Sequence, residues 1–346
     1  MPLSISRDRL EALLQAAART RIVAVGDAML DEYLVGDVER ISPEAPVPVM
    51  RVRERRYALG GAANVAQNVV ATGAECRLVA AIGDDAAGKR LTTMLDEIGV
   101  PKRGLLSVSR PTTRKTRVVA RSQQLVRIDD EDDADLTATD AARIVAAIED
   151  AVTDADALVL EDYNKGVLVP TVITRAIEIA RARRVPVVVD PKYRHFFAYR
   201  GATVFKPNRR ELESALGASV DLEHPEAIPS AIERLGVDYL LLTLGERGMV
   251  LASRDGPPKS VPTVAREVYD VVGAGDTVTA YLAAVLGAGG TAAEAAVIAN
   301  YAAGVEVGKL GAATVSATEV LEAYDHFATQ RNLPSSEIRT ADVLKG

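Results

Sequence analysis

The sequence predicts a three-layer α/β/α fold, in which helices cover both faces of a mostly parallel central sheet and a small β-sheet lid stands at one edge. Short apolar runs alternate with longer helical segments along most of the 346 residues, as in parallel α/β proteins. A proline-rich stretch at 41–49 argues against a central strand there and favours a lid. Polar residues directly follow several apolar runs, as at the ligand-binding edge of such sheets. They are Asp27, Asp162, Asp190, Lys206 and Thr243.

The first part of the chain is expected to hold an amphipathic helix within residues 1–20 and a buried strand at 21–26. The lid is expected from about 33–58 and 105–130, which are β-rich and strongly charged. Between these two segments we expect a helix opening at Gly60, a strand at 76–82 and a helix at 86–98.

The rest of the chain continues the alternation. Strands are expected at 157–160, 185–189, 203–205, 239–243 and 249–252. Helices are expected at 138–152, 169–184, 274–288, 292–307 and 317–329. All of them are assigned to one domain, 1–346, in which residues 331–346 lack periodicity and are expected to form a flexible tail.

Composition excludes several classes of protein. The chain has 41 Lys and Arg against 48 Asp and Glu, a net charge of −7, so we expect no nucleic-acid or membrane partner. Its single cysteine, Cys76, rules out an intramolecular disulfide and lies in an apolar run that suits buried packing. No signal peptide is recognised, and no apolar run reaches the roughly 18 residues of a membrane span. A cytoplasmic protein is expected.

The main candidate for chemistry is the stretch from Asp270 to Thr277. Gly273 and Gly275 let the backbone approach a ligand closely, and the free N–H groups that open the following helix, near Ala274, favour an anion. Asp276 places a carboxylate in the first turn of this helix, where the helix dipole and amides are expected to lower its pKa. The alternative is a glycine turn with an Asp that only caps the helix.

Two later loops suit a nucleotide, although each has a simpler reading. Asn208 and Glu211, after Lys206, have capping-box spacing, but they also suit a hydrated Mg²⁺ that they would touch through water. The turn after Thr243, with Gly245 and Gly248, suits a lining for phosphates or an ordinary hairpin.

Two earlier segments also carry polar groups after apolar runs. Asp162 and Lys165 follow a buried strand, where such groups rarely gather for packing alone, so we favour a functional role. The segment 83–90 nearly matches a phosphate-binding P-loop. However, Arg90 stands where a Ser or Thr should bind magnesium, so we expect a turn into a helix with Lys89 solvated.

Three signatures in order carry a family resemblance. Residues 60–64 (GGAAN), 208–211 (NRRE) and 270–276 (DVVGAGD) resemble those of the ribokinase-like carbohydrate kinases, the phosphofructokinase B group, over roughly residues 20–330. Within that family, segments 26–31, 40–48 and 121–129 are similar to the kinases of D-glycero-β-D-manno-heptose 7-phosphate. The resemblance implies a ribokinase-like fold and ATP-dependent phosphorylation of the heptose 1-hydroxyl.

The resemblance also assigns roles to residues. It implies that Asp276 accepts the sugar proton while amides around Gly273, Ala274 and Gly275 hold the transferring phosphoryl group. Asp27, Asp31 and Asn64 would bind sugar hydroxyls beside Gly60, Gly61 and Asp162. Lid arginines Arg117, Arg121 and Arg127, with Lys165, would bind the distal phosphate. The alternative is that the arginines are solvated and only keep a sheet edge from pairing with other strands. The nucleotide would meet Lys206, Asn208, Glu211, Thr243, Gly245, Gly248 and Asn300.

Several consequences follow from the same resemblance. The cofactors would be ATP and Mg²⁺, with a monovalent cation such as K⁺, although Val271 and Val272 replace the more usual threonines. The lid would pair two copies into a homodimer, because Val47, Val49 and Val119 would otherwise be exposed. In related bifunctional enzymes a nucleotidyltransferase domain follows, and since no H-x-G-H pair is present here, a separate polypeptide is expected to perform the next step. The alternatives are a kinase of another sugar, sugar phosphate or nucleoside, and a non-catalytic sugar-phosphate-binding protein.

Overall fold

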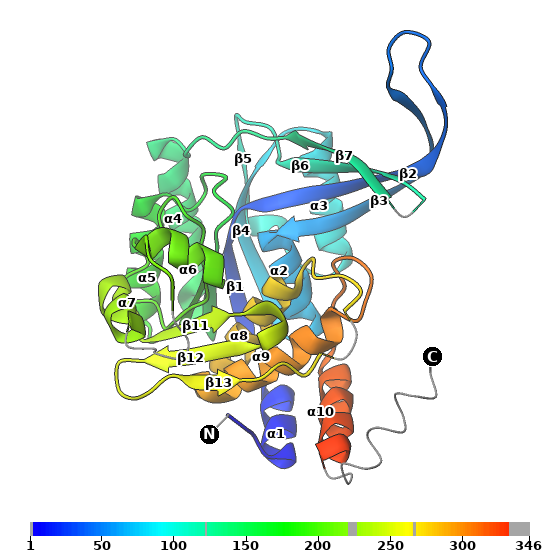
Figure 1. Ribbon diagram of the computed structural model, residues 1–346. Coiled ribbons are helices and arrows are strands. Elements are labelled where there is room, and N and C mark those ends of the chain that lie inside the picture. Colours follow the sequence, from blue (N-terminus) through cyan, green and yellow to red (C-terminus); the bar gives the residue numbers. More distant parts are fainter. Residues whose placement is uncertain (1–2, 122, 221–226, 266–267, 332–346) are drawn as a thin grey trace.

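The computed structural model of the protein describes residues 3–121, 123–220, 227–265 and 268–331. A large sheet is covered by helices on both faces, and a second, smaller sheet projects from one side of this body (Figure 1). The predicted three-layer fold with a mostly parallel sheet and a small β lid is therefore confirmed.

The large sheet has nine strands in the order β13-β12-β11-β10-β9-β8-β1-β4-β5. All neighbours pair in parallel except β11 with β12 and β12 with β13. The strands are β1 (Arg21–Gly26), β4 (Glu75–Gly83), β5 (Leu105–Val108), β8 (Ala157–Glu161), β9 (Val187–Asp190), β10 (Val204–Phe205), β11 (Tyr239–Thr243), β12 (Met249–Ser253) and β13 (Lys259–Val261).

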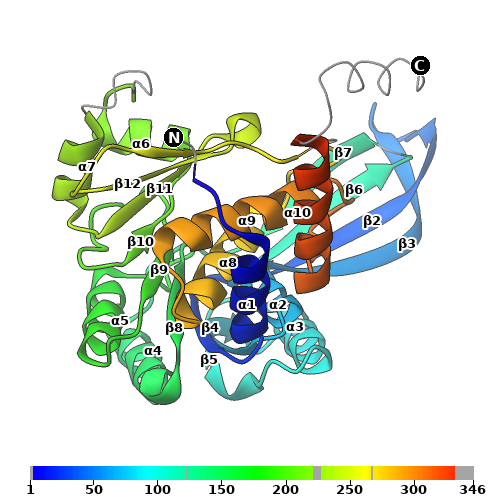
Figure 2. The same cartoon turned by 90° about the horizontal axis from the view of Figure 1, so that it is seen from below.

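Helices cover the two faces as two separate groups, which Figure 2 shows from below. Side chains of β1 alternate between them, since Ile22 and Ala24 join one apolar cluster and Val23 and Val25 the other. The first cluster packs against α1 (Arg7–Ala17), α2 (Ala62–Ala71), α3 (Ala86–Glu97), α8 (Ala274–Gly287), α9 (Ala292–Glu306) and α10 (Ala317–Arg331). The second packs against α4 (Ala138–Ala151), α5 (Pro170–Ala182), α6 (Arg209–Leu216) and α7 (Ala227–Leu235).

The lid sheet has four strands in the order β3-β2-β6-β7. They are β2 (Ala28–Ile41), β3 (Pro48–Gly61), β6 (Arg114–Ala120) and β7 (Gln123–Asp130). Only the β2–β6 pair is parallel. The expected start of the second lid segment near 105 is wrong, because β5 pairs with β4 and extends the large sheet instead.

The lid runs directly into the large sheet at its base. Strand β2 begins one residue after Asp27, and β3 ends at Gly61, immediately before α2. Gly61 has a φ of 56°, and a Cβ there would lie 2.3 Å from the Asp27 carbonyl oxygen, so only glycine fits this junction. The first residues of the lid are therefore fixed to the edge where the strands of the large sheet end.

Two further expectations concern the C-terminal tail and membrane-spanning helices. The expected flexible tail lies outside the described residues, apart from Arg331, which ends α10. Within the described ranges, none of the helices combines the length and the apolar character that crossing a bilayer requires.

Candidate active site

Neighbouring strands of the large sheet end in buried charged residues at one edge. Gly26, which precedes Asp27, pairs in register with Glu161, and Glu161 pairs with Asp190. Lys206 follows β10, the next strand, and all four charged side chains are at most 5% exposed. Since buried charges are costly unless paired, this edge is the candidate functional site.

The glycine stretch forms what we call the anion turn, residues 273–276, at the start of α8. Gly273 has a φ of 100°, and the first amide bonded within the helix is that of Thr277, which donates to the Gly273 carbonyl at 2.9 Å. The amides of Ala274, Gly275 and Asp276 precede it and have no helical acceptor. A Cβ on Gly275 would stand 3.6 Å from the Lys206 Nζ, so the turn faces the charged edge of the sheet.

Asp276 is held by side chains from two other elements. Its carboxylate accepts a hydrogen bond from Asn64 Nδ2 at 2.6 Å and one from the Tyr163 hydroxyl at 3.1 Å. Asn68, one turn further along α2, donates to the Asn64 carbonyl at 3.0 Å and accepts from the Thr277 hydroxyl at 2.9 Å. The early GGAAN signature therefore positions the carboxylate of the late GAGD signature.

The predicted lowering of the Asp276 pKa is wrong. Burial and, to a smaller extent, the charge of Asp190 raise this pKa to about 6, although the bonds from Asn64 and Tyr163 and the charge of Lys206 act in the opposite direction. The helix dipole acts on a side chain that is only 5% exposed, so desolvation dominates. A carboxylate with a raised pKa is a better general base than the sequence suggests.

Sequence reasoning missed Glu161 and assigned no role to Asp190. Ligand atoms of Glu161, Asp190 and Asp276 all lie within 4.8 Å of one another, and Lys206 Nζ donates to Asp190 at 2.9 Å. Both Glu161 carboxylate oxygens lack a hydrogen-bond partner among the described residues, and burial holds the pKa of Glu161 well above its usual range. Clustered carboxylate oxygens are the donors that Mg²⁺ prefers, so Glu161 and Asp190 fit this ion. The only sequence signal was a Glu at the end of a buried run.

The Asn208 and Glu211 pair forms a capping box at the start of α6. Glu211 N donates to Asn208 Oδ1 at 2.9 Å, and Asn208 N donates to Glu211 Oε2 at 2.8 Å. The second Glu211 oxygen accepts from Lys192 Nζ at 2.9 Å. The capping interpretation is therefore confirmed, and contact with Mg²⁺ through water stays a prediction.

Lys192 is a second residue that sequence reasoning missed. It lies two residues after Asp190, and its Nζ stands 5.1 Å from the centre of the Tyr163 ring, whose hydroxyl bonds Asp276. Its charge is held firmly, because the carboxylates of Asp190 and Glu211 raise its pKa despite burial. A cation thus contacts both Tyr163, which bonds Asp276, and Glu211, which was assigned to the nucleotide.

Two predicted sugar ligands are occupied by structural contacts. Asp27 accepts backbone bonds from Tyr163, Lys165 and Val167 at 2.8, 2.9 and 3.1 Å, which fix the loop after β8. Asp162 accepts from the Tyr199 hydroxyl at 2.7 Å and thus turns toward the second apolar cluster. Their contact with sugar stays a prediction.

Asp31 lies in β2, near the base of the lid. It is 7% exposed and accepts from Arg117 Nη1 at 2.5 Å. A Cβ on Gly60 would stand 2.9 Å from Asp31 Oδ2, so this glycine makes room for the carboxylate.

The lid cations differ in position. Lys115 and Arg117 alternate with Thr116 and share a face with Asp31 and Tyr33, their partners in β2. Arg127 lies opposite Arg117 but donates to Asp129 at 2.8 Å and is half exposed. Lys165 and Lys115 both bind Glu131, at 2.6 and 3.0 Å.

Arg121 lies apart from these cations. It is in the β6–β7 turn, six residues beyond Lys115 and hence about 20 Å along the strand. The structure therefore groups Arg117 and Lys165 with Lys115, a residue that was not predicted to bind the substrate. Arg121 lies outside this group.

The other residues assigned to the nucleotide lie at the end of β11, in the turn that follows it and on α9. Thr243 bridges to Asn208, and the 3₁₀ turn after it begins at Gly245 and is closed by Gly248. Asn300 Nδ2 on α9 donates to the Pro262 carbonyl at 2.8 Å and anchors the segment after β13. Contact of these groups with ATP stays a prediction.

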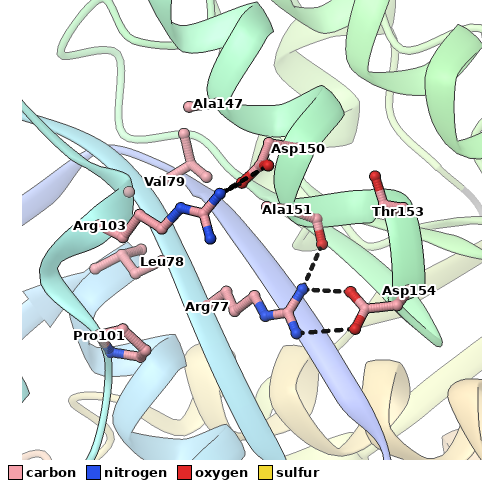
Figure 3. A pocket seen from close by; sticks show the side chains of 11 residues that line it. Arg77, Leu78, Val79, Pro101, Arg103, Ala147, Asp150, Ala151, Thr153 and Asp154 are labelled. Atoms are coloured by element: carbon pink, nitrogen blue, oxygen red, sulfur yellow. Dashed lines mark hydrogen bonds and ion pairs between the residues drawn. The ribbon is translucent and has the colours of Figure 1, made fainter.

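Two other features do not belong to this site. A hollow of about 590 Å³ lies at the opposite end of β4, where Arg77 donates to the carbonyl of Ala151 and pairs with Asp154 (Figure 3). The segment resembling a P-loop turns into α3 under a cap from Asp85, and Lys89 pairs with Asp84 in solvent, as expected.

A glycine turn that opens a helix, a buried carboxyl group beside it and a small β lid on a mostly parallel sheet are the features of a sugar kinase with a ribokinase-like fold. The chain belongs to the pfkB family of carbohydrate kinases, whose model matches residues 19–319. The family predicted from the three signatures is thereby confirmed.

Similar proteins agree with this family. The chain is 47% identical over 317 residues to the "Bifunctional protein HldE" of Rhodospirillum rubrum, covering 91% of this chain and 64% of that protein. It is 44% identical to the protein of the same name from Pelobacter propionicus, covering 98% and 70%. The chain thus spans about two thirds of the length of these relatives.

Solved structures show the same fold at low identity. Ribokinase of Arabidopsis thaliana, solved with ribose and ATP, matches with a TM-score of 0.70 and 22% identity, covering 88% of this chain and 98% of that one. Phosphofructokinase-2 of Escherichia coli matches with a TM-score of 0.73 and 18% identity, covering 89% and 99%.

Proposed function

We propose that the protein is a cytoplasmic ATP-dependent kinase that phosphorylates the 1-hydroxyl of D-glycero-β-D-manno-heptose 7-phosphate, giving the 1,7-bisphosphate for ADP-heptose synthesis. The observation that carries the proposal is the placement of Asp276, which Asn64 and Tyr163 hold at the anion turn. The lid adds the Arg117–Asp31 pair. The similarity of segments 26–31, 40–48 and 121–129 to heptose 7-phosphate kinases supports the choice of sugar.

The reaction follows from the buried groups. Asp276 accepts the proton of the sugar hydroxyl, whose oxygen attacks the γ-phosphorus of ATP while the bond to ADP breaks. The amides of the anion turn donate to the phosphoryl oxygens, and Lys192 and Lys206 add positive charge beside them. Glu161 and Asp190 would hold Mg²⁺, with Glu211 in contact through water, and the ion would supply positive charge to offset that of the phosphates.

Substrate choice is assigned to the lid. Asp31 and Asn64 provide directional acceptors and donors for sugar hydroxyls, and Arg117 with Lys115 and Lys165 provides cations for the distal phosphate. Arg117 has donors to spare, since a guanidinium carries five and the contact with Asp31 uses one. A phosphate would therefore bind without breaking that pair.

A coupled assay of ADP release tests this proposal. Wild-type protein is given Mg-ATP with heptose 7-phosphate, fructose 6-phosphate, ribose or adenosine, each with and without K⁺, and phosphorus NMR identifies the product. We expect the highest kcat/KM for heptose 7-phosphate, by at least about tenfold, and an anomeric phosphate in the product. A faster reaction with another acceptor would reject the sugar but keep the kinase. Calorimetric binding of sugar phosphate with no turnover of any acceptor would indicate a binding protein instead.

We also propose a homodimer formed through the lid. Edge strand β7 leaves Leu125, Val126 and Ile128 40–54% exposed, and Val47 is 51% exposed on the β2–β3 loop. Val49 and Val119, which were expected to be exposed, are partly buried. Sedimentation at micromolar concentration should give twice 36.7 kDa, and Val126→Asp should halve it. A wild-type mass of 36.7 kDa would refute the dimer.

A further inference from the structure

Glu306, the last residue of α9, is a buried carboxyl group that the proposed reaction does not use. The side chain is fully buried, at 0% exposure, and neither oxygen has a hydrogen-bond partner within the described part of the chain. Buried polar groups are nearly always bonded, so an unpaired carboxyl group beside a functional site requires an explanation.

The position of Glu306 relates it to the anion turn. Its Oε1 lies 3.1 Å from the point where a Cβ on Gly273 would stand, so the carboxyl group packs directly behind the turn that receives the phosphoryl group. Ala312 covers the same glycine from the loop after α9, at 3.3 Å from that point. Glu306 therefore packs against Gly273 of the anion turn, whereas Gly275 of the same turn faces Lys206.

The charges around Glu306 are mainly negative. Asp270, at the entrance of the turn, and Asp276, in α8, both oppose its ionisation, whereas Lys309 favours it. Lys309 is already engaged, because its Nζ donates to the Thr314 carbonyl at 2.7 Å and pairs with Glu319 at 2.5 Å. Burial and then the two aspartates raise the pKa of Glu306 to about 8.

The two protonation states have opposite effects on the turn. A neutral carboxylic acid fills the space behind Gly273 and leaves the positive potential of the helix N-terminus intact. An ionised carboxylate places a negative charge behind the same amides and weakens their hold on a phosphoryl group.

We propose that Glu306 is a positioning residue that supports the anion turn as a neutral acid, and that its ionisation lowers the kinase activity at alkaline pH. This inference rests on phosphoryl transfer at the anion turn and not on the identity of the sugar. Activity should be complete while Glu306 is protonated and should fall as pH rises through the range in which it ionises.

The test compares pH profiles of kcat from pH 6.5 to 9.5 for wild type, Glu306→Gln and Glu306→Val. Glu294→Gln, in the first turn of the same helix, where the side chain is 20% exposed and pairs with Arg9, is the matched control for kcat. Wild type and control should lose about tenfold in kcat between pH 7 and pH 9, and both Glu306 variants should lose less than twofold. Thermal unfolding gives a second readout. Wild type should lose Tm relative to Glu306→Gln as pH rises toward 8, since only the wild-type folded state then holds the extra proton.

Three outcomes would overturn the inference. One is an alkaline loss of activity that is unchanged in the Glu306 variants. Another is an alkaline loss that disappears when tetramethylammonium replaces K⁺, because a bound cation would then be responsible. The third is equal loss of kcat at pH 7 and pH 9 in both variants, which would indicate a purely structural side chain. If no acceptor is turned over, the proposed function fails on its own, and calorimetry of β,γ-imido-ATP binding over the same pH range still tests Glu306.

Discussion

The floor of the site and the lid sheet both carry many charges, but they hold them differently. The floor, which comprises Glu161, Asp190, Lys206 and Asp276, is buried, and the side chains of its Lys206–Asp190 pair are 4% and 7% exposed. In the lid, the Arg53–Asp37 pair is 53% and 44% exposed. Removing one partner in the floor leaves a charge without water, whereas solvent replaces a lost partner of such an exposed lid pair. The Arg117–Asp31 pair near the base of the lid, at 17% and 10% exposed, lies between these two cases. We therefore expect the proposed reaction to depend on the floor and the choice of substrate to depend on the lid.

The substitution Asp276→Asn tests the floor and is expected to have the largest effect on kcat. The amide keeps the shape but cannot accept a proton, so kcat should fall about 10³-fold while sugar binding, measured by calorimetry, stays within a fewfold. Asp156→Asn, beside the opposite end of β8, is the control and should keep kcat. Near-normal turnover in Asp276→Asn would remove this residue from catalysis.

Lys192 tests whether the floor extends beyond these four residues. Lys192→Met should lower kcat about 10²-fold, because a cation beside Tyr163 and Glu211 is lost where phosphoryl charge develops. Lys192→Arg should recover part of this loss, since the charge remains but its geometry differs. Its side chain is 26% exposed, so both variants should fold, as circular dichroism can check.

The matched control is Lys89→Met, which changes the lysine of the segment that resembles a P-loop. This side chain is 75% exposed and should not affect turnover. Equal effects of the two substitutions would contradict the role given to Lys192.

The same contrast explains what the sequence could predict. The anion turn and the strand ends were predictable, because glycine spacing and polar residues after apolar runs are local signals. Glu161 and Lys192 were not, because the parallel pairing of β8 with β9 and the course of the chain after β9 bring Glu161 to Asp276 and Lys192 to Tyr163. The prediction of a lowered pKa for Asp276 was wrong for the same reason, since the burial of this side chain depends on elements that are distant in sequence. In the lid, the positions of the cations depend on strand register. The pairing of β6 with β2 places Arg117 beside Tyr33 and leaves Arg121 in the turn beyond, a difference that the sequence does not show.

The smallest expected effect belongs to the lid, and it should appear in KM rather than kcat. Arg117 is 17% exposed and faces Asp31, so its bond to a phosphate group would be worth about 1.5–3 kcal/mol. Arg117→Ala should then raise KM for the sugar phosphate roughly 10- to 100-fold, with kcat within a fewfold of wild type. Arg121→Ala, in the turn beyond β6, should leave both constants within twofold. A free sugar of the same stereochemistry separates the phosphate contact from general damage, because Arg117→Ala should barely change its KM. If Arg117→Ala instead lowered kcat as strongly as Lys192→Met, the lid would share in the chemistry, and the division between floor and lid would fail.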